Sequence, residues 1–270
     1  MAALSPLRLT PVRKVKIATI VVLLACWQLV SMSGLLFEGV MPPPLAVLGA
    51  LVRELGERSL YRDLGITMFE AGIGFLIGSL IGISVGIWLG GSGFMRRAFE
   101  PYVHALASMP KIIFLPILFL VFGLGIESKI AKAAMSTFFP VGLSTMAGFM
   151  QIDSVLINVG RSFHLRRAQM VRMIYLPAIL RPLMVGLQLG VGMSIIGVLT
   201  AEIAYASVGI GARLIRYSDN FNIASTYAVM IIIFAGTASV NYLFIRAQRP
   251  FLRYDRARTD AAGALAQPAP

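Results

Sequence analysis

Six long apolar runs constrain the fold of this chain more than any other feature. Each contains about twenty residues with few charges, the length that an α-helix needs to cross the hydrocarbon core of a bilayer. Only 13% of the 270 residues are charged and 57% are hydrophobic, which leaves too few charges to cover a globular surface. The sequence therefore predicts an all-α integral membrane protein with six transmembrane helices. The runs cover residues 17–37, 67–89, 102–124, 130–150, 183–206 and 224–245.

Lys and Arg gather between these runs on one side. Four of them precede residue 17, two are Arg96 and Arg97, five lie in the loop 151–182 and five lie in the tail from Arg246 onward, which makes sixteen of 24. Because cytoplasmic loops of membrane proteins retain positive charge, we expect both termini to be cytoplasmic. This orientation also accounts for the net charge of +12, since the chain has no basic face interleaved with aromatic residues that would predict binding to nucleic acid.

The predicted organisation is a cytoplasmic segment 1–16, a single transmembrane domain 17–250 that contains the loop 151–182, and a cytoplasmic tail 251–270. The end of the tail, residues 259–270, is rich in Ala, Gly, Gln and Pro and has little to bury. We therefore expect this end to be disordered.

A Pro-rich segment follows the first run on the external side. Three prolines in residues 41–44 block a continuing helix, and the apolar spacing of residues 45–55 predicts a short amphipathic helix. We expect this helix to lie on the outer membrane surface.

Glycine recurs at every fourth position of the second run, so that one face of the predicted helix carries no side chains. Another backbone can approach such a face closely, as happens when helices associate in lipid. Two interpretations are open, namely packing within one subunit and a seam between two copies. The helix-packing glycines are Gly74, Gly78, Gly82, Gly86 and Gly90.

The loop 151–182 is the most basic internal segment of the chain. It contains Asn158-Val159-Gly160-Arg161-Ser162-Phe163-His164 and, after nine further residues, Ile174-Tyr175-Leu176-Pro177. This pattern resembles the Glu-Ala-Ala-x-x-x-Gly-x(9)-Ile-x-Leu-Pro motif of permeases in binding-protein-dependent ABC transporters, which contacts the transporter's ATPase. In this comparison Asn158 stands at the motif's Glu, and His164 stands at its Gly.

Further segments, in order along the chain, resemble the nitrate, sulfonate and taurine branch of that family. Together with the loop they cover about three quarters of the sequence. They are Met41-Pro42-Pro43-Pro44, the glycine series, Met109-Pro110-Lys111, Phe122-Gly123-Leu124-Gly125 with Ser128-Lys129, Phe138-Phe139-Pro140, and Ala201-Glu202 before Gly209-Ile210-Gly211.

The resemblance implies the membrane-spanning permease subunit of an ATP-driven importer with a type I-like fold, in the inner membrane of a bacterial cell. It implies a second copy of the permease, two cytoplasmic ATP-binding subunits and an extracytoplasmic solute-binding protein as partners. ATP and Mg would be bound by the partner ATPase, so we expect no cofactor in this chain. The solute implied is a small anionic compound such as nitrate, a sulfonate, taurine or a related organic molecule.

The residues themselves agree with a transport subunit that is not an enzyme. The chain has no Gly-x-x-x-x-Gly-Lys-Ser/Thr sequence, and neither His104 and His164 nor paired carboxylates form a catalytic or metal-binding pattern. The alternative is a secondary transporter or channel driven by an ion gradient. That class favours several acidic residues inside the spans, and here only Glu70 and Glu202 lie within them or at their ends.

The resemblance places the ATPase-docking surface on the loop 151–182. Phe163 and Leu165 would be apolar anchors in a groove of the partner, and the arginines would face its carboxylates. If the motif's glycine has a positive φ, histidine at position 164 pays a cost there that glycine avoids, so a loop that turns differently from the motif's is the alternative. A generic basic cytoplasmic loop is the alternative. The candidate docking residues are Asn158, Arg161, Ser162, Phe163, His164, Leu165, Arg166, Arg167 and Pro177, the last of which would end one helix and set the angle of the next.

Two charged residues are candidates for the solute path. Lys111 follows Pro110 inside the third run, where a kink would let it face a central cavity and favour anions. The alternatives are that Lys111 reaches the membrane surface or binds carbonyl groups of a neighbouring helix. Glu202 lies near the outer end of the fifth run, where it would be an external gate, a structural partner or a solvated residue.

Overall fold

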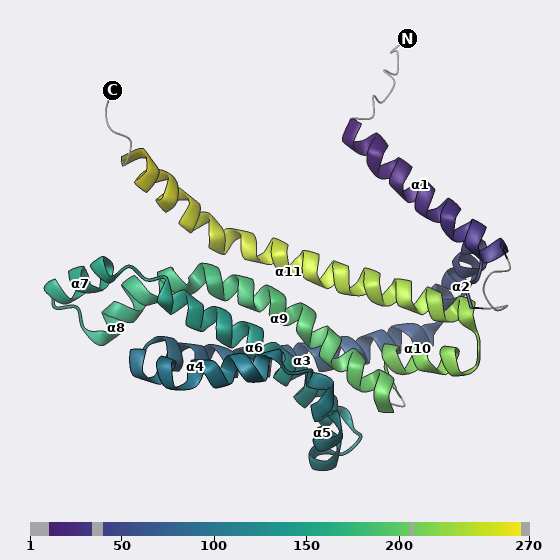
Figure 1. The fold of residues 1–270 in the computed structure, drawn as a ribbon, viewed down its shortest axis with the longest axis horizontal. Helices are drawn as coiled ribbons and strands as arrows, with labels where there is room; N and C mark the ends of the chain where they lie inside the picture. Colours follow the sequence, from purple (N-terminus) through teal and green to yellow (C-terminus); the bar gives the residue numbers. More distant parts are fainter. Residues whose placement is uncertain (1–10, 34–39, 206–207, 266–270) are drawn as a thin grey trace, which may run out of the picture. The chain divides into compact units, whose positions relative to one another are not determined.

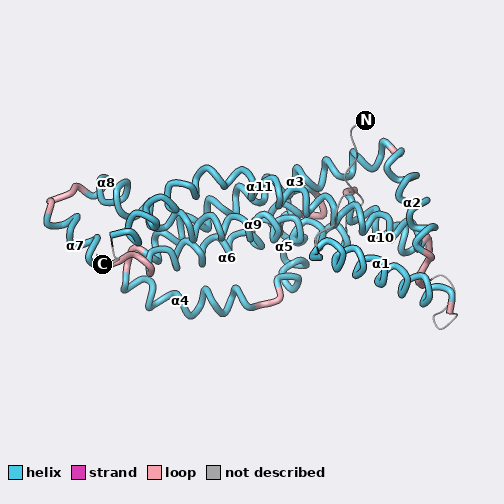
Figure 2. The backbone as a smooth tube through the Cα atoms, turned by 90° about the horizontal axis from the view of Figure 1, so that it is seen from above, coloured by secondary structure: helices cyan, strands magenta, loops and turns pink. Residues whose placement is uncertain are grey.

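The computed structural model describes residues 11–33, 40–205 and 208–265, with side chains omitted at positions 11, 13, 167 and 250–265. Regular structure in these ranges is entirely helical, as Figure 2 shows, which confirms the predicted all-α class. The helices are α1 (Pro11–Met32), α2 (Pro44–Gly56), α3 (Arg58–Gly90), α4 (Gly93–Ser108), α5 (Leu115–Phe122), α6 (Ile126–Met150), α7 (Ser154–Ser162), α8 (Arg167–Met170), α9 (Leu176–Tyr205), α10 (Ile210–Asp219) and α11 (Ile223–Leu265), with a 3₁₀ turn, η1 (Lys111–Phe114), and a π turn, η2 (Val171–Tyr175).

Among the described residues, five helical segments are long and apolar enough to cross a membrane, and a sixth candidate is a pair of shorter helices, α4 and α5, which meet at a bend of 90°. The third run, predicted over residues 102–124 with a kink at Pro110, is therefore two helices that meet at a sharp break and not one kinked helix. Met109, which precedes Pro110, has extended backbone angles (φ −67°, ψ 141°). Proline disfavours a helical conformation in the residue before it and has no N–H to donate, so the helix ends there.

The chain forms two compact units. The first contains residues up to Leu60 together with Arg213–Ile232, and the second contains Tyr61–Ala212 and the residues from Ile233 onward.

In the first unit, α2 begins at Pro44, where a missing N–H has no consequence, and this agrees with the short helix predicted after the Pro-rich segment. The indole of Trp27 on α1 donates to the carbonyl of Pro42 at 3.0 Å, and the hydroxyl of Ser31 donates to the carbonyl of Met41 at 2.9 Å. These bonds hold the backbone at residues 41 and 42 against α1.

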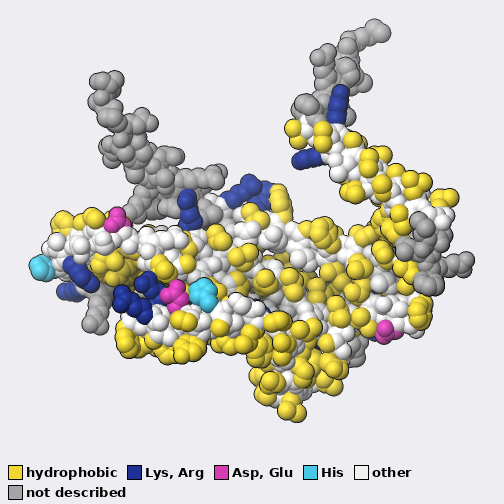
Figure 3. All heavy atoms as spheres, viewed as in Figure 1, with side chains coloured by type: hydrophobic (Ala, Val, Ile, Leu, Met, Phe, Trp, Pro, Cys, Tyr) yellow, Lys and Arg dark blue, Asp and Glu magenta, His cyan; other side chains and the backbone are white. Residues whose placement is uncertain are grey.

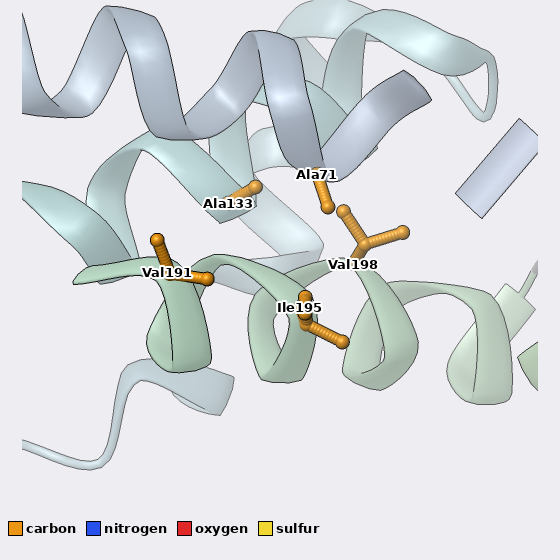
Figure 4. Close-up of a cluster of buried hydrophobic side chains, with 5 residues drawn as sticks. All are labelled: Ala71, Ala133, Val191, Ile195 and Val198. Carbon is orange, nitrogen blue, oxygen red and sulfur yellow. The ribbon is translucent and has the colours of Figure 1, made fainter. Parts of the chain in front are cut away.

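The core of the second unit lies between α3, α6 and α9. Figure 1 shows α6 and α9 side by side, and Figure 4 shows buried side chains of all three helices converging. Ser194 donates to the carbonyl of Ala71 at 2.5 Å, and Thr137 donates to the carbonyl of Gly190 at 3.2 Å. Small and hydroxyl-bearing residues thus bring the helices close, as is usual inside a membrane. The apolar cluster is Ala71, Ala133, Val191, Ile195 and Val198.

The glycine face of α3 packs against α6 of the same chain. A Cβ atom added at Gly78 would lie 2.8 Å from the Cβ of Thr137, and one added at Gly86 would lie 2.6 Å from the Cβ of Thr145. Such distances are too short for real Cβ atoms, so only glycine permits this approach. Gly74, Gly82 and Gly90 make equally close approaches to α6. This is the geometry that packing within one subunit requires.

The last helix is longer than the sequence suggested. α11 extends to Leu265, through most of the tail segment expected to be disordered, and residues 266–270 lie outside the described part. The Ala- and Arg-rich composition has a high intrinsic helix propensity, and a helix that already exists adds such residues without a new nucleation step.

Candidate functional site

The loop between α6 and α9 turns at a residue in the left-handed conformation. His164 has φ 51°, one of two described non-glycine residues with a positive φ. Its N–H donates to the carbonyl of Arg161 at 2.9 Å, and the N–H of Leu165 donates to the carbonyl of Gly160 at 3.0 Å. These two bonds form a Schellman motif at the end of α7, a motif whose left-handed position is usually glycine. His164 therefore takes the conformation that the glycine of the resembled motif would allow.

Gly160 lets this turn close on itself. It is buried, and a Cβ atom added there would lie 2.6 Å from the Cδ1 atom of Ile174 and 3.4 Å from the Cδ1 atom of Leu165. Leu165 thus packs over the last turn of α7 and is half-buried. Because its side chain packs within the loop, Leu165 exposes less apolar surface to a partner protein than the sequence suggested.

The remaining candidate docking residues face outward. The Phe163 side chain is 75% exposed, although phenylalanine normally avoids water, and Asn158, Arg161, Ser162 and Arg166 are exposed beside it. We call these five residues the loop surface. Figure 3 shows Lys, Arg and His side chains gathered at the end of the second unit where α4 and α7 lie. The side chain of Arg167 is outside the described part.

Pro177 does not end a helix as predicted. α8, the π turn η2 and α9 follow one another without a break, and Pro177 is the second residue of α9. The N–H of Leu176 donates to the carbonyl of Val171, five residues earlier, and this wider turn carries the chain past a proline that has no N–H of its own.

Glu202 is buried, with 1% of its surface exposed, so it is not a solvated residue at the membrane edge. One carboxylate oxygen accepts the hydroxyl of Thr67 at 2.7 Å, and the other accepts the N–H of Gly211 at 2.8 Å. The Thr67 hydroxyl oxygen in turn accepts the N–H of Ile210 at 3.0 Å. Glu202 and Thr67 therefore hold the first residues of α10, where backbone N–H groups lack helical partners and a negative charge is favoured. This arrangement matches the structural-partner interpretation.

A buried ion pair links α3 to α6. Glu70, with no exposed surface, contacts the ammonium group of Lys129, which is 2% exposed. Glu70 is one turn before Gly74 on the glycine face of α3, so the ion pair continues the line of close contact between the two helices.

Lys111 lies at the break of the third span. Its ammonium group donates to the carbonyl of Ala107 at 2.8 Å and lies 5.1 Å from the centre of the Phe139 ring on α6. The carbonyl belongs to the same predicted span, four residues earlier, and not to a neighbouring helix as one alternative to the solute-path interpretation had it. A second lysine, Lys132, lies on α6 two helical turns before Phe139, on the same face of that helix. Lys132 is 3% exposed, and its ammonium group donates to the hydroxyl of Ser136 at 3.3 Å.

Sequence reasoning missed Lys132, although it lies within the predicted fourth run. Its signal was a cation in the middle of an apolar segment, where the cost of burial usually implies a function. The same signal led to Lys111 and to the acidic residues of the spans, but not to Lys132.

Comparison with known proteins identifies the family. Residues 59–253 match the family of binding-protein-dependent transport system inner membrane components. The match covers both the loop surface and the Glu202 network. The chain belongs to this family. It is the inner membrane permease component of an ABC importer and not its ATPase. The family implies that an ATPase and a solute-binding protein are its partners.

Curated relatives include three permeases with named solutes. The permease is 29% identical over 234 residues to the putative aliphatic sulfonates transport permease SsuC of Bacillus subtilis, which covers 86% of this chain and 84% of the relative. It is 30% identical to the taurine transport system permease TauC of Escherichia coli, over 72% of this chain and 73% of the relative. It is also 30% identical to the nitrate import permease NrtB of Synechocystis, over 71% and 72%.

Solved structures support the fold. The permease superposes on a chain from inward-facing conformations of the MetNI methionine ABC transporter with a TM-score of 0.62. The superposition covers 72% of the permease and 95% of that chain at 20% sequence identity.

Proposed function

We propose that this permease forms, with a second copy of itself, the membrane path of an importer for a small anionic solute. Two cytoplasmic ATP-binding subunits, which hold ATP and Mg, dock on the loop surface, and an extracytoplasmic binding protein delivers the solute. The loop surface is the observation that carries the proposal. An exposed phenylalanine beside two arginines, held by a closed turn, suits a groove with an apolar floor and acidic edges.

The docking part of the proposal is tested by Phe163→Asp in the permease expressed with its ATPase. The substitution buries an unpaired carboxylate in the contact at a cost of about 3 to 5 kcal/mol, which weakens docking by more than about a hundredfold. Phe221→Asp is the matched control, because Phe221 is 85% exposed and follows α10 in a turn of the same kind, with φ 53°. We expect the ATPase to co-purify with the control and not with Phe163→Asp. Equal co-purification of both variants would contradict the docking assignment.

The proposed topology has six spans and both ends in the cytoplasm, with the bent pair α4 and α5 as the third span. The distribution of basic residues supports it. Single cysteines at Asp219 and Arg167, in a background with Cys26 replaced by Ser, test it with a membrane-impermeant thiol reagent. Labelling from outside is expected at position 219 and not at position 167. The reverse pattern would overturn the orientation.

The solutes named for the relatives support an anionic solute for this permease. Sulfonates, taurine and nitrate, named for the three relatives, each carry a negatively charged oxygen group. The two acidic residues of the predicted runs are both engaged, Glu70 by Lys129 and Glu202 by Thr67 and Gly211. A gradient-driven carrier needs intramembrane acids that are able to exchange ions, so their engagement supports the ATP-driven importer over that alternative.

A further inference from the structure

Two buried lysines lie three residues apart on α6 and have opposite surroundings. Lys129 is neutralised by Glu70. Lys132 has a hydroxyl partner, Ser136, and no acidic partner among the residues whose side chains are described. An ammonium group has three hydrogens to donate, and one bond of 3.3 Å to a neutral hydroxyl leaves most of that capacity unused. The charge of Lys129 is therefore compensated by a carboxylate, whereas the charge of Lys132 is not compensated by any described side chain.

The surroundings of Lys132 add a second positive charge. Lys132, Ser136 and Phe139 recur at intervals of four and three, so they share one face of α6. Lys111 lies over the Phe139 ring and Lys132 contacts Ser136, so both ammonium groups lie along this face of α6. Lys111 is half-buried and Lys132 is buried. Two like charges brought together inside a membrane are costly unless a counterion joins them.

The position of this pair is also informative. Lys111 is the first residue of η1, in the break between α4 and α5. Discontinuous helices in the middle of a membrane recur at the solute sites of transporters, because they bring backbone and polar groups into an apolar region. We propose that Lys132 and Lys111 bind the negatively charged group of the solute within the membrane.

This inference rests on the proposed function, and it names the group of the solute that the permease itself recognises. Lysine is a compact point charge without the fixed fork of arginine, so the site selects charge and small size and not one oxyanion geometry. Nitrate, a sulfonate or a small carboxylate would all satisfy it. Selection within this class would then fall to the binding protein.

The test is the thermal unfolding of the full-length permease in lipid nanodiscs, with increasing ethanesulfonate at constant ionic strength and then with nitrate. A ligand that binds the folded state raises the unfolding midpoint until the site is saturated. We expect a saturable rise for the native chain. For Lys132→Met we expect at least about tenfold weaker dependence on the anion and, without anion, a midpoint at or above the native one, because the unpaired charge is gone. Lys111→Met should also weaken the dependence.

Lys129→Met is the matched control on the same helix. It leaves Glu70 buried without its partner, so we expect a lower midpoint with the dependence on anion retained. The proposal is overturned if the native chain responds to neither anion, if Lys132→Met responds as the native chain does, or if Lys132→Met lowers the midpoint in the absence of anion. None of these measurements needs the ATPase. A permease that couples to its ATPase without responding to anions therefore refutes this inference alone, and the opposite result refutes only the docking.

Discussion

Replacing His164 by glycine should tighten the loop that ends α7. A residue with a Cβ atom pays about 1–2 kcal/mol to adopt the left-handed conformation, and His164 has φ 51°. Glycine removes this cost but adds about 0.4–1 kcal/mol of conformational entropy to the open state. The difference favours the closed turn by about 0.5–1 kcal/mol, since both hydrogen bonds of the motif are made by backbone atoms and are kept.

Amide hydrogen exchange at Leu165 measures this change directly. Its N–H is bonded to the carbonyl of Gly160, so it exchanges only when the turn opens. A gain of about 0.5–1 kcal/mol slows exchange by roughly two- to fivefold, after correction for the intrinsic rate of each sequence. A measurement of global unfolding would not report it, because a surface loop opens locally.

Phe163→Gly is the control for this prediction. Phe163 has φ −83°, an angle that every residue adopts easily. Glycine at this position therefore relieves no backbone strain and only adds conformational entropy to the open loop. Exchange at Leu165 should become faster. If His164→Gly also speeds exchange, or leaves it unchanged, strain at this position does not limit the stability of the turn.

Three other substitutions probe the second and first units. Glu202→Gln replaces a carboxylate oxygen that accepts a hydrogen bond by an amide NH₂ group that cannot, and should lower the unfolding free energy by about 1–3 kcal/mol. Thermal unfolding in nanodiscs measures this loss, and an unchanged midpoint would show that the bond to α10 contributes nothing. Gly86→Ala places a Cβ 2.6 Å from a threonine and should cost about 1–3 kcal/mol, whereas Gly72→Ala on the same helix meets nothing within 4 Å and should be neutral; similar losses in both would contradict the packing argument. Hydrogen bonds from the Ser59 hydroxyl and, to a lesser extent, from the Arg213 guanidinium lower the pKa of Glu57 below 4.5. The stabilisation from this contact is therefore complete above pH 4.5 and is lost as the pH falls through the lowered pKa. Glu57→Gln should remove that pH dependence of stability, and a variant that keeps it would show that another group titrates.

Much of the fold followed from the spacing of apolar residues, because a helix in lipid must satisfy its own backbone and the required length is set by the bilayer. Pro110 predicted a kink in the third span, but the extent of the break, a bend of 90°, did not follow. Hydropathy averaged over twenty residues does not register a single missing N–H. The length of α11 was not predicted either. A low content of apolar residues was taken as evidence against a helix, although a helix needs only its own backbone bonds.

The candidate site was predictable where the evidence was local. The motif pointed to residue 164 as the position where the loop either takes a positive φ or turns differently, and His164 has the positive φ. The partners of the buried charges were not predictable in this way. Glu202 is 135 positions from Thr67, and no local pattern announces which threonine will reach it. Only the packing of α3 against α9 decides such a pair.

The contact between α3 and α6 has a mechanical consequence. Interfaces made of long side chains can slide, because rotamers exchange and the grooves refill in a second arrangement. At Gly78, Gly82 and Gly86 the surfaces that meet are largely main chain, and they have one way of fitting together. We therefore expect α3 and α6 to move as one rigid body during transport. Hinges would then lie where the helical backbone is irregular, at the break around Pro110 and at the π turn that follows the loop surface.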